Sequence, residues 1–242
     1  MRTCVVIPTY SNSSTISRVI GSALDYCPDV IVVCDGADKA TVDAVESFRG
    51  RIDIISYPVN RGKGHALRMG LGLARERGFD YAITMDSDGQ HFADDIPLFL
   101  EAISSWSGPL YVGSRPLDAE NMPSGNTFAN RFSNFWFTVQ TWLRLPDTQT
   151  GFRAYPLSAC VMPLSNRYEA ELEMLVRTAW RGVKIVPVPI KVYYAPASER
   201  VTHFRKGKDF MRISLMNTIL TMAAIVYGWP ATLFHKLTGG RK

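Results

Sequence analysis

Two aspartates one residue apart give the clearest chemical signal in the sequence. Asp86 and Asp88 follow the apolar run Tyr81–Met85 in a glycine-containing turn, and Gln90 comes next at the same spacing. Alternate residues of an extended segment point the same way, so the three side chains can converge on one point. Oxygen ligands suit a hard cation such as Mg²⁺ or Mn²⁺, which can hold a diphosphate and neutralise it as it leaves. We therefore predict a metal site formed by Asp86, Asp88 and Gln90.

The elements that must position this turn alternate between strands and helices. Apolar runs predict the strands, and apolar residues at helical spacing predict the helices between them. This alternation favours a doubly wound, mostly parallel sheet flanked by helices. The expected strands are Thr3–Pro8, Val30–Asp35, Ile52–Tyr57, Tyr81–Met85 and Leu110–Gly113, and the expected helices are Ser14–Tyr26 (capped by Asn12 or Ser13), Thr41–Phe48, Gly64–Arg77 and Asp94–Ser105.

Polar clusters follow four of these strands. In open α/β sheets, ligands bind beyond the carboxyl ends of the strands. We therefore expect the four clusters to form a single site. They are Pro8-Thr9-Tyr10, Asp35-Gly36, Asn60-Arg61-Gly62-Lys63 and Asp86-Ser87-Asp88.

The pattern changes after Arg115. Pro116–Thr127 reads as a loop, and Phe128–Leu145 reads as a helix with an aromatic stripe. Such a stripe suits either a protein core or a membrane interface. The remaining expected elements are a polar loop entering a strand over Asp147–Tyr155, a helix over Glu169–Arg181 and a strand over Lys184–Tyr194.

A long uncharged segment, Ile213–Phe234, lies near the C-terminus. Its 22 residues are enough to span a membrane. Polar residues and helix breakers interrupt it, so we favour a buried or interfacial helix over a span. The interruptions are Ser214, Asn217 or Thr218, Thr221, Gly228 and Pro230. We divide the chain into a catalytic domain, 1–198, and a tail, 199–242, made of a basic linker and this helix.

The charge of the chain is concentrated in the tail. From Glu199 onward there are eight Lys or Arg residues and two Asp or Glu residues, whereas the chain as a whole carries +5. Such a basic segment suits nucleic acid or an anionic membrane surface, and we expect the membrane and no nucleic acid. The four cysteines form no Cys-x-x-Cys pair, and a strand begins at Thr3, so we expect free thiols and no signal peptide. The expected location is the cytoplasmic face of the membrane, as a peripheral protein.

Together these landmarks resemble family 2 glycosyltransferases, which have the GT-A fold, across nearly the whole chain. The matching segments are Ile7–Tyr10, Val32–Ala37, Asn60–Ala66 and Asp86–His91. Gln90-His91 and Asp147–Arg153 are similar to the dolichyl- or polyprenyl-phosphate hexose synthases, of the mannosyl and glucosyl types. Two departures are Cys34 and Ala37, where the family has Asp and Ser. A third is Glu199–Arg205, which differs from the usual Gly-x-Ser-Lys ending.

The resemblance implies a GDP- or UDP-hexose donor, a Mg²⁺ or Mn²⁺ cofactor and roles for particular residues. Donor contacts are expected from Pro8, Tyr10, Asp35, Asn60, Lys63, Asp86 and Arg115. Catalytic roles are expected for Asp88, Asp147 and Arg153. Contacts with an acceptor or its phosphate are expected from Gln149, Arg200, His203 and Arg205.

The expected activity is metal-dependent, inverting transfer of a hexose to a polyprenyl phosphate, in cell-envelope glycan synthesis. A phosphate acceptor is already anionic and needs little deprotonation. A lipid or glycan hydroxyl would need a carboxylate base, for which Asp147 or Glu171 is the candidate. Asp147 could instead pair with Arg153. The alternative outside enzymes is a non-catalytic membrane-binding module of the same fold, and the intact metal motif argues against it.

Overall fold

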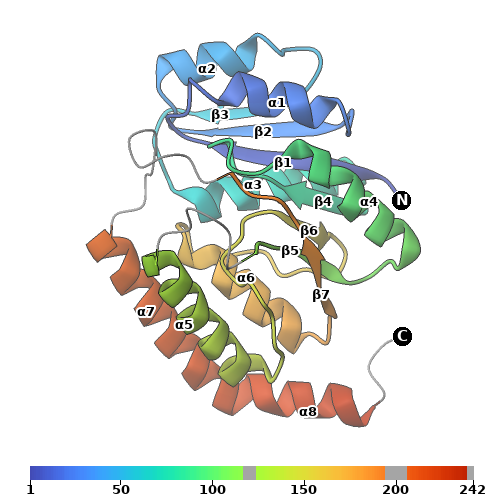
Figure 1. Ribbon diagram of the computed structural model, residues 1–242, viewed down its shortest axis with the longest axis vertical. Coiled ribbons are helices and arrows are strands. Elements are labelled where there is room, and N and C mark those ends of the chain that lie inside the picture. Colours follow the sequence, from blue (N-terminus) through green and yellow to red (C-terminus); the bar gives the residue numbers. More distant parts are fainter. Residues whose placement is uncertain (117–123, 194–205, 239–242) are drawn as a thin grey trace.

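The computed structural model describes residues 1–116, 124–193 and 206–238. Its strands form one seven-stranded sheet in the order β3-β2-β1-β4-β6-β5-β7 (Figure 1). The bounds are β1 Thr3–Thr9, β2 Val30–Asp35, β3 Asp53–Tyr57, β4 Tyr81–Thr84, β5 Leu110–Ser114, β6 Arg153–Pro156 and β7 Ile185–Pro189.

The predicted mostly parallel sheet is confirmed. β1 pairs in parallel with β2 and β4, β2 with β3, and β5 with β7. β6 runs antiparallel to both of its neighbours, β4 and β5. The carboxyl ends of β1 to β4 therefore meet at one edge of the sheet, and β6 brings the segment before Arg153 to that same edge.

Helices cover both faces of the sheet. Helices α1, α2 and α4 contribute to the core on one face, and α3 and α6 to the core on the other. Helices α5, α7 and α8 form an outer layer beside α6, at the bottom of Figure 1. The bounds are α1 Ile16–Leu24, α2 Lys39–Glu46, α3 Lys63–Glu76, α4 Ile96–Ser105 after the 3₁₀ turn Ala93–Asp95, α5 Ser124–Thr141, α6 Glu169–Trp180, α7 Lys206–Ala223, the π-helical turn Ala224–Gly228 and α8 Trp229–Leu237.

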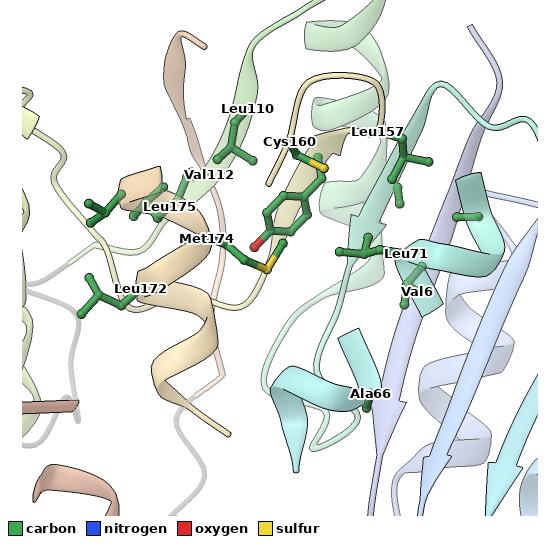
Figure 2. Packing of buried hydrophobic residues seen from close by; sticks show 14 of the residues in the cluster. Val6, Ala66, Leu71, Leu110, Val112, Leu157, Cys160, Leu172, Met174 and Leu175 are labelled. Atoms are coloured by element: carbon green, nitrogen blue, oxygen red, sulfur yellow. The ribbon is translucent and has the colours of Figure 1, made fainter. Parts of the chain in front are cut away.

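The central strand β1 shows how the sequence builds this core. Cys4 and Val6 belong to the cluster under α3 and α6, whereas Val5 and Ile7 belong to the cluster under α1. Successive strand residues point to opposite faces, so a strand covered on both sides is apolar throughout. Figure 2 shows Val6 beside Leu71 of α3, with α6 packed on the same cluster.

Helix α1 begins later than predicted, and neither expected cap is used. It starts at Ile16, and the backbone carbonyl of Asn12 accepts hydrogen bonds from the N–H groups of Thr15 and Ile16. The Asn12 side chain instead donates from Nδ2 to Ser87 Oγ at 2.6 Å. Asn12, which local sequence predicted to cap the helix, therefore bonds instead to a loop residue 75 positions away.

The two outer helices also differ from prediction. Helix α5 begins at Ser124, within the predicted loop, and ends at Thr141, where Trp142 adopts a φ of 57°. The expected break near Gly228 is absent, because the helix continues through a π-helical turn. Gly228 instead permits close packing: a Cβ there would lie 2.3 Å from Cε2 of Trp180.

Candidate functional site

A cavity of about 240 Å³ lies at the carboxyl ends of β1 to β4. Its walls come from the four polar clusters predicted to form one site. The predicted residues that line it are Pro8, Tyr10, Asp35, Asn60, Lys63, Asp86, Asp88 and Gln90. The expectation that strand-end clusters meet at one place is confirmed by this geometry.

Asp35 organises the loop on one side of the cavity. Its carboxylate accepts hydrogen bonds from the backbone N–H groups of Arg61 and Gly62, each at 2.7 Å, and from Nδ2 of Asn60 at 3.0 Å. A carboxylate has about four acceptor positions, so about one remains for a ligand. Asp35 therefore shapes the Asn60–Lys63 loop as well as facing the cavity.

Two glycines allow backbone to pass close to the site. Gly62 has a φ of 101°, and a Cβ there would lie 2.4 Å from the carbonyl oxygen of Asn166. A Cβ at Gly151 would lie 2.7 Å from Oδ2 of Asp86 and 2.9 Å from Nζ of Lys63. Side chains at these positions would displace the loop or crowd the charged groups.

Hydrogen bonds from the segment just before helix α1 hold the acidic turn. Asn12 donates to Oγ of Ser87 at 2.6 Å, and Oγ1 of Thr15 donates to the Ser87 carbonyl at 2.7 Å. Within the turn, Oδ1 of Asp88 accepts from the Gln90 N–H at 3.0 Å. These hydrogen bonds hold the turn mainly through Ser87. Most of the oxygen lone pairs of Asp86 and Asp88 therefore remain available to other partners.

Lys63 lies between two carboxylates. Its Nζ is 2.6 Å from Oδ1 of Asp86 and 3.0 Å from Oε2 of Glu171. Burial disfavours the Lys63 charge, but the attraction of the two carboxylates outweighs it and raises the pKa of Lys63. Burial likewise opposes ionisation of Asp86, but Lys63 outweighs it and lowers the pKa of Asp86. Both groups are charged at neutral pH.

The surroundings of Asp88 disfavour its negative charge, whereas those of Asp86 favour it. Burial, together with the negative charge of Asp86, raises the pKa of Asp88 to about 6. Two carboxylates and the amide of Gln90 line one cavity, and such oxygen donors suit Mg²⁺ or Mn²⁺. A divalent cation would relieve the repulsion between the aspartates, so these residues fit the predicted metal. In the described ranges no group of three His, Cys, Asp or Glu residues is arranged to hold a metal.

Asp147 lies outside the cavity lining, although a catalytic role was expected for it. Its side chain is fully buried and accepts five hydrogen bonds: from Nε of Arg115 at 2.6 Å, Nη2 of Arg115 at 3.0 Å, the Arg115 N–H at 3.4 Å, Nδ2 of Asn130 at 2.6 Å and the Gln149 N–H at 2.9 Å. Burial disfavours its charge, but these partners outweigh burial and lower the pKa of Asp147. A buried, fully bonded, weakly basic carboxylate is unsuited to act as a catalytic base.

Arg153, for which a catalytic role was also expected, lies away from the cavity as well. It is fully buried, and its guanidinium donates to the carbonyls of Thr150, Glu171 and Thr148 at 2.7 to 2.9 Å. It therefore holds the loop before β6 against α6 and does not line the cavity. The predicted pairing of Asp147 with Arg153 is wrong, since Asp147 pairs with Arg115.

The other predicted contacts have mixed outcomes. Arg115 binds Asp147 and stands outside the cavity lining, and Gln149 is exposed with Nε2 donating to the Ala129 carbonyl at 3.1 Å. Arg200, His203 and Arg205 lie outside the described residues.

Sequence reasoning missed several wall residues. Arg167 and Tyr168, just before α6, and Asp209, in the first turn of α7, line the cavity opposite the strand ends. They lie far from the motifs along the chain and match no short pattern. Thr9 also lines the cavity, and its Oγ1 is buried with no partner among the described residues. Its position directly after Pro8, in a predicted cluster, was the available signal.

This fold and site define an α/β protein with a cavity at its strand ends, which is where open α/β sheets bind their ligands. The profile described as "Glycosyl transferase family 2" matches residues 4–156. The chain therefore belongs to glycosyl transferase family 2 and is a glycosyltransferase.

Two characterised relatives resemble most of the chain. An undecaprenyl-phosphate mannosyltransferase of Micrococcus luteus is 30% identical over 203 residues, covering 78% of this chain and 83% of the relative. A UDP-N-acetylglucosamine–dolichyl-phosphate N-acetylglucosaminyltransferase of Methanococcus voltae is 29% identical over 237 residues, covering 88% and 94%.

A solved structure confirms the expected GT-A fold. Glucosyl-3-phosphoglycerate synthase from Mycobacterium tuberculosis, in complex with Mn²⁺, UDP-glucose and phosphoglyceric acid, aligns with a TM-score of 0.61. The alignment covers 93% of this chain and 78% of the synthase at 16% identity. At that identity the likeness concerns the fold alone.

Proposed function

We propose that this glycosyltransferase moves a hexose from a GDP- or UDP-linked donor to a polyprenyl phosphate, with inversion and with Mg²⁺ or Mn²⁺ bound. The observation that carries the proposal is the cavity at the strand ends, where Asp86, Asp88, Gln90 and Lys63 meet. This combination suits a metal-bound diphosphate. The two named relatives, which use undecaprenyl or dolichyl phosphate, support the acceptor class.

The donor would lie across the edge formed by β1, β2 and the Asn60–Lys63 loop. Asp35 has an acceptor position left for a base or ribose, and the buried hydroxyl of Thr9 has no partner among the described residues. Helix α3 begins at Lys63, so its positive end and the Lys63 ammonium both face the region of the diphosphate.

Asp86, Asp88 and Gln90 would hold the cation. When bound, the cation supplies Lewis-acid stabilisation of the leaving nucleoside diphosphate. Lys63 would keep Asp86 ionised and oriented, because it already contacts Oδ1 at 2.6 Å. Asn12 and Thr15 would fix the turn through Ser87, so that the ligands need little rearrangement.

The surroundings of the candidate bases favour a phosphate acceptor over a hydroxyl. Asp147 is buried with five hydrogen bonds, and Glu171 is paired with Lys63 at 3.0 Å. A hydroxyl must lose its proton to such a base as it attacks. A phosphate oxygen is already anionic and can attack the anomeric carbon from the face opposite the leaving group. The site is therefore equipped for the acceptor that needs no base.

The enzyme would meet a lipid phosphate at the membrane surface, and we propose the cytoplasmic face. Within the described residues, one helix, Gly207–Leu237, is long and apolar enough to cross a membrane, with a mean hydropathy of 1.4. Its presence beside the cavity supports a membrane-bound acceptor and a role in cell-envelope glycan synthesis.

The test is transfer by the full chain in detergent with Mn²⁺ and labelled donors. UDP- and GDP-hexoses should each be offered with polyprenyl phosphate and, as the matched control, with polyprenol. We expect one donor to give a labelled polyprenyl-phosphate sugar and an equal amount of nucleoside diphosphate, with no transfer to polyprenol. Transfer to polyprenol, or no lipid product with any donor, would contradict the proposal.

A further inference from the structure

The outer helices have an inverted pattern of burial. Most surface helices of soluble proteins bury their apolar stripe and expose their polar one. In α5, by contrast, Asn130, Ser133 and Gln140 are buried, whereas Phe132, Phe135 and Trp142, just beyond the helix, are exposed. Among the α5 side chains that the structure describes, Phe137 is an aromatic one that is fully buried. The aromatic stripe predicted from the sequence is thus largely on the surface.

The C-terminal helix also exposes large apolar side chains along its length. Its inner stripe, Asn217, Leu220, Ala224 and Gly228, is buried against α5 and α6. Its opposite stripe, which we call the outer face, consists of large apolar side chains that are 62% to 81% exposed. They are Met211, Leu215, Met222, Val226, Phe234 and Leu237.

Specific contacts hold the inner stripe to the domain. Nε2 of Gln140 donates to the side chains of Asn217 and Thr221, each at 3.2 Å. Nε1 of Trp229 donates to the Val139 carbonyl at 2.9 Å. Farther along, the His235 ring packs so closely on Gly182 that a Cβ there would lie 2.9 Å from it. The helix is therefore attached to the domain from Asn217 to His235.

This attachment decides how the helix can meet a bilayer. A helix that crosses the ~30 Å hydrocarbon layer is surrounded by lipid or by other membrane-spanning elements. Here only 17% of the most apolar 18-residue window is buried, yet separate contacts from Asn217 to His235 attach the helix to the domain. Crossing would either pull that domain into hydrocarbon or break every inner contact.

We propose that the C-terminal helix lies flat in the membrane interface, with its outer face inserted among the acyl chains and its inner stripe still docked on α5 and α6. In-plane helices bury an apolar face roughly 5–10 Å into the headgroup and acyl boundary. This membrane contact would explain how the enzyme meets a lipid acceptor. It rests on the proposed function only for the identity of that acceptor.

The charges at the ends of the outer face favour a membrane over a second copy of the chain. Exposed Lys208 and Arg212 stand at one end, and exposed Lys236 stands at the other. Cations at both ends complement anionic lipid headgroups. If a second copy of the chain packed its outer face on this one, with the two helices parallel or antiparallel, the cations of one copy would lie against those of the other. Asp209 is buried, and one oxygen is 3.7 Å from Arg212.

The first turn of α7 connects this surface to the active site. Asp209 is buried in the cavity wall, whereas the next two residues, Phe210 and Met211, are exposed on the outside. A helix lying in the interface would therefore place the mouth of the cavity beside the lipid headgroups. A lipid phosphate could reach the donor without leaving the membrane surface.

The first test measures depth with single cysteines in the full chain. The four native cysteines are at most 3% exposed, so a nitroxide reagent should label Met211→Cys, Met222→Cys and Leu237→Cys selectively. In vesicles of equal parts phosphatidylcholine and phosphatidylglycerol, the proposal predicts the same shallow depth for all three labels. A deep label at Met222 between two shallow ends would show a crossing helix and overturn the proposal. Leu98→Cys on α4 is the control and should stay in water.

The second test measures vesicle binding, with neither donor nor acceptor present, so it can fail independently of the proposed function. Leu215→Glu and Met222→Glu should each weaken sedimentation with these vesicles at least about tenfold, since each removes a large apolar side chain from the membrane. Leu98→Glu, on an exposed part of α4, should bind like wild type. Equal thermal melting of the variants would show that they fold.

Two results of this second test would overturn the proposal. One is wild-type protein remaining in the supernatant at low salt. The other is light scattering that shows a dimer which Leu215→Glu dissociates, because a second copy would then cover the outer face.

Discussion

Two acidic loops at the same edge of the sheet have opposite surroundings. The loop at Asp86 and Asp88 lines the cavity, and burial, together with the negative charge of Asp86, raises the pKa of Asp88. The loop at Asp147 points inward, and Arg115, Asn130 and a backbone N–H group satisfy its carboxylate. The number of partners, more than the residue type, separates a carboxylate that can bind a cation from one that holds the fold.

A substitution of Asp88 gives the strongest test of this difference between the two loops. Asp88→Asn should lower turnover by about 10³-fold, because a Lewis-acid metal supplies several kcal/mol to the transition state. Its unfolding temperature should change little, since the side chain makes one hydrogen bond within its own turn. Nucleoside diphosphate release and thermal melting measure the two effects. Asp94→Asn, which alters an exposed pair with Lys191, is the matched control and should retain activity.

Asp147 should show the reverse behaviour. Asp147→Asn leaves Arg115 without a counter-charge in a partly buried position, and breaking a buried pair costs about 3–5 kcal/mol of folding free energy. Urea denaturation measures that loss. Below its melting temperature, the variant should keep turnover within a few-fold of wild type. A stable Asp147→Asn protein with no turnover would instead restore the catalytic role that we reject.

Asp35 is intermediate between Asp88 and Asp147. It faces the cavity, and it also holds the Asn60–Lys63 loop by hydrogen bonds. Asp35→Ala should weaken binding of the nucleoside diphosphate by about 1–3 kcal/mol, the scale of a lost hydrogen bond to a charged group. Calorimetry measures the affinity, and Asp43→Ala, an exposed acid on α2, serves as the control. Unchanged affinity would place the nucleotide elsewhere along the edge.

The smallest effect is expected at an exposed ion pair. Lys39 and Asp43 are 2.5 Å apart with side chains 86% and 59% exposed. Lys39→Ala should leave the denaturation midpoint unchanged, because solvent screens such pairs. A loss comparable to that of Asp147→Asn would mean that burial does not explain the difference between the two ion pairs.

The sequence predicted most of the sheet and the strand-end half of the cavity. Both depend on local patterns, namely apolar strands followed by polar turns, and parallel strands bring such turns together without knowledge of distant contacts. Asp147 and Arg153 could not be assigned this way, since their partners are set by tertiary packing. Arg167, Tyr168 and Asp209 were missed for the same reason, because they reach the cavity from α6 and α7.

The aromatic stripe of α5 shows another limit of pattern reading. Periodicity identifies an apolar face but does not say whether protein or membrane covers it. The buried polar groups of Asn130 and Gln140 decide the question only once their partners on neighbouring elements are known. The same holds for the tail helix, where the inner stripe is recognised by its contact with Gln140.

The central claim is that a cation held by Asp86, Asp88 and Gln90 binds the donor diphosphate. Calorimetric titration of UDP and GDP into the wild-type chain, with Mn²⁺ and then with EDTA, tests it directly. We predict that one of the two binds wild type and Asp147→Asn only when Mn²⁺ is present, and that this binding is lost in Asp88→Asn. Equal binding in EDTA, or binding by Asp88→Asn as tight as by wild type, would contradict the account.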